Sequence, residues 1–234
     1  TVNWDVEYPV PHLSSKVKKF ASYKGTLQYL PFLPSSLKEL TIEHSSLTSL
    51  PELPKGLKIL RVNYIDLEKL PNLPKGLKEL CCIGNDLKYL PKLPKGLEKL
   101  DCSCNNLTSL PDLPKGLKHL NCESNKLSSL PNLPKGLKVL DYNKNSIVAS
   151  KLPDSIEYLY CDSNKLTSLP ELPEGLKLLH CSSNDLTSLP ELPSHLEELI
   201  CYFNRRLETF PTCPNSLKTY RSYDGVYPIP SIGM

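Results

Sequence analysis

The sequence predicts a repeat solenoid, in which short parallel strands line a concave face, extended polyproline-like backbone forms the convex side, and there is almost no helix. Two observations predict this fold. A leucine-based motif recurs about every 20 residues along most of the 234-residue chain, and 23 prolines accompany it. One such unit cannot bury its apolar side chains alone, whereas stacked units share a continuous core.

The repeat keeps a constant register. Its general form is L-x-x-L-x-C-x-x-N-x-L-x-x-L-P-x-L-P-x-x, and residues 97–116, LEKLDCSCNNLTSLPDLPKG, are representative. The units begin at Val17, Leu37, Leu57, Leu77, Leu97, Leu117, Leu137, Ile156, Leu176 and Leu196, and Leu217 opens the last segment. We therefore expect an N-terminal cap over 1–16, ten repeats over 17–216 and a C-terminal cap over 217–234.

Each part of the unit has a local physical reason. In L-x-x-L-x-C, the second Leu and the Cys are two residues apart, so both point to one face of a short strand. The Asn three residues after the Cys can hydrogen-bond to backbone groups at the turn, and stacking predicts a ladder of such amides. The prolines of L-P-x-L-P fix φ and remove backbone donors, which favours an extended return over a helix.

The two end units depart from the consensus in the same way. The Cys and Asn positions hold Ser22 and Gly25 at one end, and Ser222 and Gly225 at the other. Terminal repeats that lose the consensus are typical of caps, because the outer face of the last unit meets water.

These motifs resemble those of the shortest, 20-residue class of leucine-rich repeat proteins. The L-P-x-L-P signature is similar to that of bacterial type III secreted effectors, one group of which also carries a C-terminal ubiquitin-ligase domain. The present chain corresponds to the repeat domain only, without a ubiquitin-ligase domain, and Cys holds the strand position usually taken by Val or Leu. The resemblance implies a secreted effector or host-interacting protein with a role in virulence.

The residues indicate a protein that is not an enzyme and that binds no cofactor or metal. Asp101, His119 and Asp141 fall near one another on successive expected strands, but they fit a solvated concave surface better than a catalytic triad. No phosphate-cradling glycine motif is present. A net charge of +3 disfavours a dedicated nucleic-acid binder, and no apolar stretch is long enough to span a membrane. We expect no small-molecule substrate either.

The cysteines are expected to be structural. Six of the nine share one inward position, namely Cys82, Cys102, Cys122, Cys161, Cys181 and Cys201. Free Cys behaves as a small buried hydrophobe. A disulfide ladder and a zinc site are the alternatives, but stacked side chains disfavour the disulfide torsion and the spacing is not that of a zinc ligand pair. Reduced thiols imply a cytoplasmic, reducing compartment, or the host-cell cytosol after delivery.

The remaining cysteines fall outside this column. We expect Cys81 and Cys104 to be exposed on or near the concave side, and Cys213 to be buried in place of a Leu.

The outward strand positions predict a protein-binding surface on the concave face. Towards the C-terminus these positions become apolar and aromatic, and such a gathering is typical of a protein-binding hot spot. The expected contact residues are Val139, Tyr158, Tyr160, Leu178, His180, Ile200 and Tyr202, with a smaller cluster of Ile59, Arg61 and Tyr64. The leading hypothesis is therefore an interaction scaffold for a partner protein, from the host or a copy of itself.

Two alternatives remain open. One is a structural protein that assembles through the ends or edges of its solenoid. The other, weaker alternative is an anion- or nucleic-acid-binding module that uses the lysines recurring once per repeat, such as Lys78 and Lys138. The same edge also carries glutamates such as Glu98 and Glu157, which favours solubility as the role of these lysines.

Overall fold

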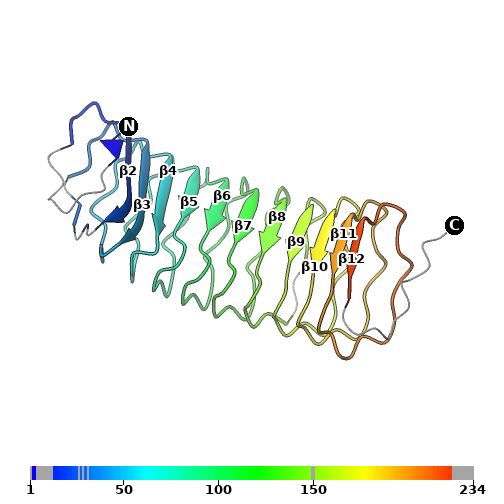
Figure 1. Ribbon diagram of the computed structural model, residues 1–234. Coiled ribbons are helices and arrows are strands. Elements are labelled where there is room, and N and C mark those ends of the chain that lie inside the picture. The colour runs from blue at the N-terminus through cyan, green and yellow to red at the C-terminus, as the bar shows by residue number, and fades with distance from the viewer. Residues whose placement is uncertain are drawn as a thin grey trace.

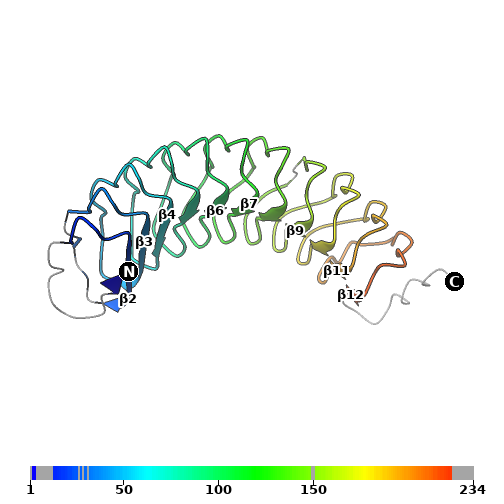
Figure 2. The ribbon, with the colours of Figure 1, turned by 90° about the horizontal axis from the view of Figure 1, so that it is seen from above.

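The chain forms one curved parallel sheet with its returns on the outer side. The computed structural model describes residues 2–3, 13–25, 27, 29–30, 32–148 and 151–222. Figure 1 shows the strands side by side along the length of the molecule, and Figure 2 shows them on the inner side of the arc. The predicted solenoid is confirmed, and no helix occurs in the described ranges.

Twelve strands in chain order make up this sheet in the described residues. They are β1 (Val2–Asn3), β2 (Lys19–Gly25), β3 (Glu39–Ser45), β4 (Ile59–Asn63), β5 (Glu79–Cys81), β6 (Lys99–Asp101), β7 (His119–Asn121), β8 (Val139–Asp141), β9 (Tyr158–Tyr160), β10 (Leu178–His180), β11 (Glu198–Ile200) and β12 (Thr219–Arg221). From β2 onward, each strand lies where the L-x-x-L segment of a unit predicts it. Gly225 and most of 1–16, assigned above to the caps, lie outside the described residues.

The register places equivalent positions of neighbouring repeats next to one another. Leu100 of β6 faces Leu80 of β5 and Leu120 of β7. Because side chains alternate across a strand, the central Leu points into the core and its two neighbours point out to the concave face. The inter-strand spacing of about 4.8 Å then sets the separation of side chains along each outward column.

The core is a continuous stack of leucines and cysteines. In the unit that begins at residue 97, Leu97, Leu100, Cys102 and Leu107 are completely buried. Leu110, at the start of the return, is 9% exposed. Since the same pattern repeats along the chain, every inner unit is covered on both sides by its neighbours.

The returns are held by turns and by a second set of backbone contacts. The amide of Leu57 donates to the carbonyl of Pro54 at 3.0 Å, and the same turn recurs at most units. On the segment after the strand, the amide of Asn106 donates to the carbonyl of Leu87 at 2.9 Å. Neighbouring repeats are therefore joined by backbone hydrogen bonds both in the sheet and in the segment after each strand.

Strands β2 and β3 are longer than the rest. β2 and β3 have 7 residues each, whereas β5 to β12 have 3. The ladder asparagine is replaced by Gly25 and Ser45 in β2 and β3, and these two residues pair with each other as strand residues. Where the asparagine is present, the chain leaves the sheet before reaching it. None of the described segments forms a helix that could cross a membrane.

Candidate functional site

The concave face carries two outward columns and a third row just beyond the strand ends. The first column contains Val139, Tyr158 and Leu178, which pair in register on β8, β9 and β10. Because the strands are short and parallel, these side chains stack along the array. The register thus brings together residues that lie about 20 positions apart in the sequence.

Six of the predicted contact residues form a contiguous area, here called the apolar patch. It consists of Val139, Tyr158, Tyr160, Leu178, His180 and Ile200. Tyr158 is 36% exposed, and the other five are partly exposed. In the second column His180 lies between Tyr160 and Ile200. Tyr202, also predicted here, follows β11 in the third row, and its ring lies 6.3 Å from that of Phe203.

Polar contacts fix the aromatic side chains of the patch. The rings of Tyr160 and His180 meet edge to face, with centroids 5.0 Å apart. His180 Nε2 lies 2.9 Å from Glu198 Oε1. Burial raises the pKa of Tyr160, and the charges of Asp141 and Glu198 raise it further. The phenol is therefore held neutral in a fixed position, which is the state in which it can serve as an apolar anchor with a polar tip.

The smaller predicted cluster is only partly assembled. Ile59 and Arg61 both project from β4, and Arg61 pairs with Glu79 through its Nε at 3.0 Å and its second guanidinium nitrogen at 2.9 Å. Tyr64, however, stacks on the ring of His44, with centroids 4.9 Å apart and the planes parallel within 1°. Its ring also covers Gly84, which has no side chain to obstruct it.

Sequence reasoning missed this stack of His44 and Tyr64 over Gly84. All three residues occupy the position before the ladder position, which holds Ser45, Ile65 and Asn85 in these repeats. The backbone takes positive φ there in repeat after repeat. Aromatic residues at that position, with glycine in the next unit, are the signal that could have revealed it.

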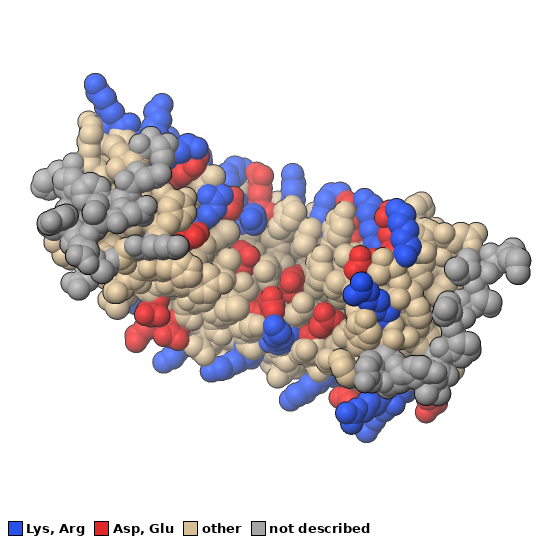
Figure 3. All heavy atoms as spheres, viewed as in Figure 1, with Lys and Arg blue, Asp and Glu red and all other residues tan. Residues whose placement is uncertain are grey.

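An acidic group occupies the middle of the concave face, next to the apolar patch. Figure 3 shows acidic side chains there, with lysines and arginines mainly along the edges. The acidic centre, as we name it, consists of Asp101, Glu123, Asp141 and Asp162, one from each of four successive repeats. Asp101 and Asp141 lie in the second column, whereas Glu123 and Asp162 lie one row further along the chain.

Burial and like charge act on these carboxyl groups. Burial raises the pKa of Asp141 to about 6 against the opposing effect of the Asn143 amide, and Glu123, Asp162 and Asp101 raise it further. Burial likewise raises the pKa of Asp162, although the Ser182 amide opposes the shift. Glu123 forms an ion pair with Lys144 at 2.9 Å.

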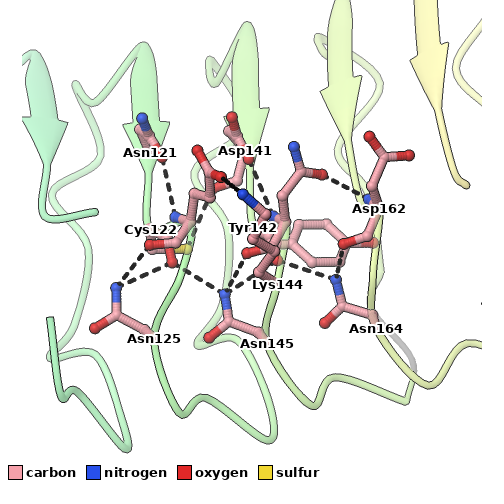
Figure 4. A network of polar contacts seen from close by, with 11 residues as sticks. Asn121, Cys122, Asn125, Asp141, Tyr142, Lys144, Asn145, Asp162 and Asn164 are labelled. Atoms are coloured by element: carbon pink, nitrogen blue, oxygen red, sulfur yellow. Dashed lines mark hydrogen bonds and ion pairs between the residues drawn. The ribbon is translucent and has the colours of Figure 1, made fainter. Parts of the chain in front are cut away.

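Below the acidic centre runs the predicted asparagine ladder, which is confirmed. Asn145 Nδ2 donates to the carbonyls of Cys122 and Tyr142, both at 3.0 Å, and its Oδ1 accepts from the Leu127 amide at 2.9 Å. Figure 4 shows Asn125, Asn145 and Asn164 in a row, making the same contacts in successive repeats. The ladder anchors the strand ends and hence the side chains of the concave face.

The cysteine column is buried and unbonded, as predicted. All nine cysteines are free, and the six column thiols are buried. Cys122 Sγ, for example, lies 3.4 Å from the Asp141 carbonyl. Burial raises the pKa of each column thiol, to about 12 for Cys201. Cys213 is buried and Cys104 exposed, both as expected.

The prediction that Cys81 is exposed is wrong. Its side chain faces the concave side, but the residue is only 5% exposed. The reason is local packing, because Cys81 Sγ lies 3.5 Å from Glu79 Oε1, and Glu79 is itself held by Arg61 and Lys99. Burial raises the pKa of Cys81 to about 12. Among the described residues, no group of His, Cys, Asp or Glu is arranged to hold a metal ion.

The lysine edge is internally paired at several places. Lys78 contacts Glu98 at 2.6 Å, and Lys218 contacts Glu197 at 2.7 Å. Glu157 accepts from both Lys138 and Lys177, and these hydrogen bonds lower its pKa to about 2. Glutamates thus interrupt the row of lysines from Glu98 to Glu197, so this part of the edge presents charges of both signs. Lys18, Lys38 and Lys58 precede it in the same row and form no ion pair among the described residues.

Comparisons with known proteins agree with this architecture. The family model described as Leucine Rich Repeat matches residues 96–117. The leucine-rich repeat domain of a Shigella effector is 36% identical, with a TM-score of 0.60, and the match covers 64% of this chain and 70% of that one. The chain belongs to the leucine-rich repeat family.

Two further solved structures cover almost the whole array. YopM from Yersinia enterocolitica WA-314 is 34% identical with a TM-score of 0.77, and the match covers 92% of this chain and 52% of that chain. The present chain thus spans about half the length of YopM. The leucine-rich repeat protein LIC12759 from Leptospira interrogans is 26% identical with a TM-score of 0.70, covering 95% of this chain and 67% of that one. A comparison with curated protein sequences finds no match.

Proposed function

We propose that this protein is a scaffold that binds a partner protein through the apolar patch on the concave face of β8 to β11. The observation that carries the proposal is the contiguous set of apolar and aromatic side chains, partly exposed, on a sheet whose other face is the core. A solenoid that needs these residues only for stability would place polar side chains at solvent-facing positions.

The patch has the composition of a binding hot spot. Tyr160 supplies a large ring fixed by His180, and Ile200 supplies aliphatic surface on the other side of His180. Fixed aromatic side chains lose little conformational entropy on binding, so more of their burial contributes to affinity. Tyr160 and Ile200 are therefore expected to contribute most.

The similarity to bacterial effectors supports a role in contact with host proteins, and nine free cysteines support work in a reducing compartment such as the host cytosol. The role proposed for this chain is binding, and ubiquitin-ligase activity, which one group of such effectors has, is not part of the proposal.

The test is a quantitative capture experiment with host-cell cytosol. Wild-type protein is compared with the double variant Tyr160→Ala/Ile200→Ala and with Tyr89→Ala, which removes a ring that is 58% exposed but lies outside the patch. We expect at least one protein to be retained by wild type and Tyr89→Ala and lost with the double variant.

Two measurements make the result decisive. Circular dichroism and thermal unfolding must show that the double variant is folded, since both changes are at partly exposed positions. Sedimentation over a range of concentrations then tests self-association. Equal capture by all three proteins contradicts the proposal, and a mass that rises with concentration only when the patch is intact would make the partner a second copy.

A further inference from the structure

We infer that the partner segment seated on the concave face is basic at one end and apolar at the other, with its lysine or arginine side chains on the acidic centre and its apolar side chains on the apolar patch. This inference rests on the proposed function and deepens it by stating the chemistry of the partner.

The acidic centre gives the middle of the concave face a local excess of negative charge. The acidic centre and the adjoining Lys144 place four carboxyl groups and one ammonium group on this part of the face. The whole chain has a net charge of +3. The sign of the concave centre is therefore opposite to that of the molecule, so overall charge does not explain it.

Three of the four carboxyl groups of the acidic centre form no ion pair among the described residues. Among the ion pairs of the described residues, only Glu123 of the acidic centre takes part, through Lys144. Arg61 and Lys99, on the same face, both contact Glu79 instead. The side-chain contacts of Asp101, Asp141 and Asp162 are hydrogen bonds from amide and hydroxyl groups.

Hydrogen bonds from backbone amides orient the carboxylates of Asp141 and Asp162. Asp141 Oδ1 accepts from the Asn143 amide at 3.0 Å, and Asp162 Oδ1 accepts from the Ser182 amide. One oxygen of each group is thereby fixed. The second oxygen of Asp141 and of Asp162 is not used in these bonds and is left to accept a hydrogen bond from an incoming cation, whereas Asp101 Oδ2 already accepts from Asn121 Nδ2 at 3.2 Å.

The carboxylates of the acidic centre repel one another, and a basic partner would relieve this repulsion. Burial raises the pKa of Asp141, and the three neighbouring carboxylates raise it further, so like-charge repulsion adds to the cost of its ionised form in the free protein. A cation placed among these carboxylates relieves the repulsion as it binds. Charge complementarity of this kind sets both partner choice and the rate of association.

The acidic centre and the apolar patch lie close enough together for one peptide segment to contact both. From Asp141 on β8 to Ile200 on β11 there are three strand steps, about 14 Å at 4.8 Å each, which an extended chain covers in about four residues. A single extended segment of about ten residues can therefore contact the acidic centre and the apolar patch together.

The experiment measures binding of three fluorescein-labelled decapeptides by anisotropy. The first has four arginines in one half and leucine and tyrosine in the other. The second replaces the arginines with glutamates, and the third replaces the apolar residues with serines. We expect the first to bind most tightly, with affinity that falls as salt is raised.

Protein variants assign the two halves. Asp141→Asn/Asp162→Asn keeps the amide contacts and should lower affinity for the first peptide about 3- to 30-fold, with a weaker dependence on salt. Glu52→Gln/Glu171→Gln removes the same charge from the exposed returns and should change little. Tyr160→Ala/Ile200→Ala should lower affinity and leave the salt dependence unchanged.

The outcomes separate this inference from the proposed function. Equal binding of the glutamate peptide, unchanged affinity in Asp141→Asn/Asp162→Asn, or no binding of the first peptide at submillimolar concentration overturns the inference. If the cytosolic capture still depends on Tyr160 and Ile200 in that case, the proposed function stands with a partner of different charge. A basic peptide that binds only with its apolar half intact supports both.

Discussion

Asn105 shows what the repeated asparagine does as a single side chain. Its Nδ2 donates to the carbonyls of Cys82 at 2.8 Å, Cys102 at 3.1 Å and Ser103 at 3.0 Å. Its Oδ1 accepts from the Leu87 amide at 3.1 Å. One buried amide therefore satisfies backbone groups of two repeats, which water cannot reach.

Replacing Asn105 with alanine should destabilise the fold strongly. The change leaves buried carbonyls and a buried amide without partners, and we expect a loss of about 2–4 kcal/mol in the free energy of unfolding. The adjacent Asn106→Ala is the matched control, because that side chain makes one exposed hydrogen bond to Asp86. Urea unfolding of the two variants checks the difference, and equal midpoints would contradict the ladder's energetic role.

The raised pKa of Asp141 predicts how the stability of the protein depends on pH. Its folded pKa of about 6 lies above the ordinary value of 3.8, so the folded state holds the proton more tightly than the unfolded state. Its effect on stability is therefore most favourable below about pH 4, declines as pH rises to about 6 and is constant above that.

Asp141→Asn should remove this dependence and stabilise the protein at pH 7 by about 1 kcal/mol, a value reduced for the partial exposure of the group. Thermal unfolding of both proteins at pH 5 and pH 7 is the measurement. The gain from the substitution should be larger at pH 7, and a gain that is equal or larger at pH 5 would reverse the sign and refute the argument.

The exposed thiol belongs to Cys104, and this gives a prediction of reactivity. A maleimide reagent should label Cys104 in the native protein and spare Cys81 and Cys82, because both are buried and burial raises the pKa of their thiols. Peptide mapping identifies the labelled residue. Cys104→Ser should abolish the fast phase of labelling, and a fast phase that persists in this variant would show that another thiol is accessible.

At the scale of the elements, the loop after each strand is defined by a backbone conformation that recurs from repeat to repeat. The residue before the ladder position has positive φ in unit after unit, from His44 to Phe203, and only Gly84 among them is a glycine. A β-carbon at Gly84 would lie 2.3 Å from the Tyr64 ring. Glycine is thus needed here for the neighbour it accommodates as well as for its own backbone.

Gly84→Ala should therefore displace Tyr64 from its stack on His44 and destabilise the protein by about 1–2 kcal/mol. Gly116→Ala is the control, since a β-carbon there meets nothing within 4 Å, and it should be neutral or slightly stabilising. Urea unfolding measures both, and Tyr64→Ala/Gly84→Ala should lose less than the sum of the single changes. Full additivity would show that the two residues do not interact.

The same scale shows what the sequence can and cannot predict. Period, strand position, inward cysteines and the asparagine ladder all follow from spacing, because stacked units repeat one geometry. The burial of Cys81 and the partner of Tyr64 do not follow from spacing. They depend on which way Glu79 and Tyr64 turn, and those choices are set by side chains in the neighbouring repeats.

The candidate site, like the fold, could be predicted from the sequence only in part. The columns of the concave face could be read from the repeat, so the grouping of Tyr160, His180 and Ile200 was predictable. The contact of His180 with Glu198 was not, since it joins different columns of adjacent strands. The predicted role of these residues in binding remains a prediction that the capture experiment tests.

For the whole molecule, stability comes from stacking and requires no covalent cross-link. The column thiols lie in a core shared with leucines that are completely buried, and all cysteines are free. Four of the six column thiols are directed towards a carbonyl of the next repeat, as Cys161 Sγ is towards His180 at 3.2 Å. A thiol engaged in this way is not oriented towards another sulfur.

Reducing agent should consequently leave the unfolding midpoint unchanged. Purified protein is unfolded in urea with and without dithiothreitol, and free thiols are counted in denaturant beforehand. Since a native disulfide typically contributes about 2–4 kcal/mol, a cross-link anywhere in the array would lower the midpoint when reduced. A lower midpoint together with fewer than nine titratable thiols would contradict the reduced column and, with it, the proposal of a reducing compartment.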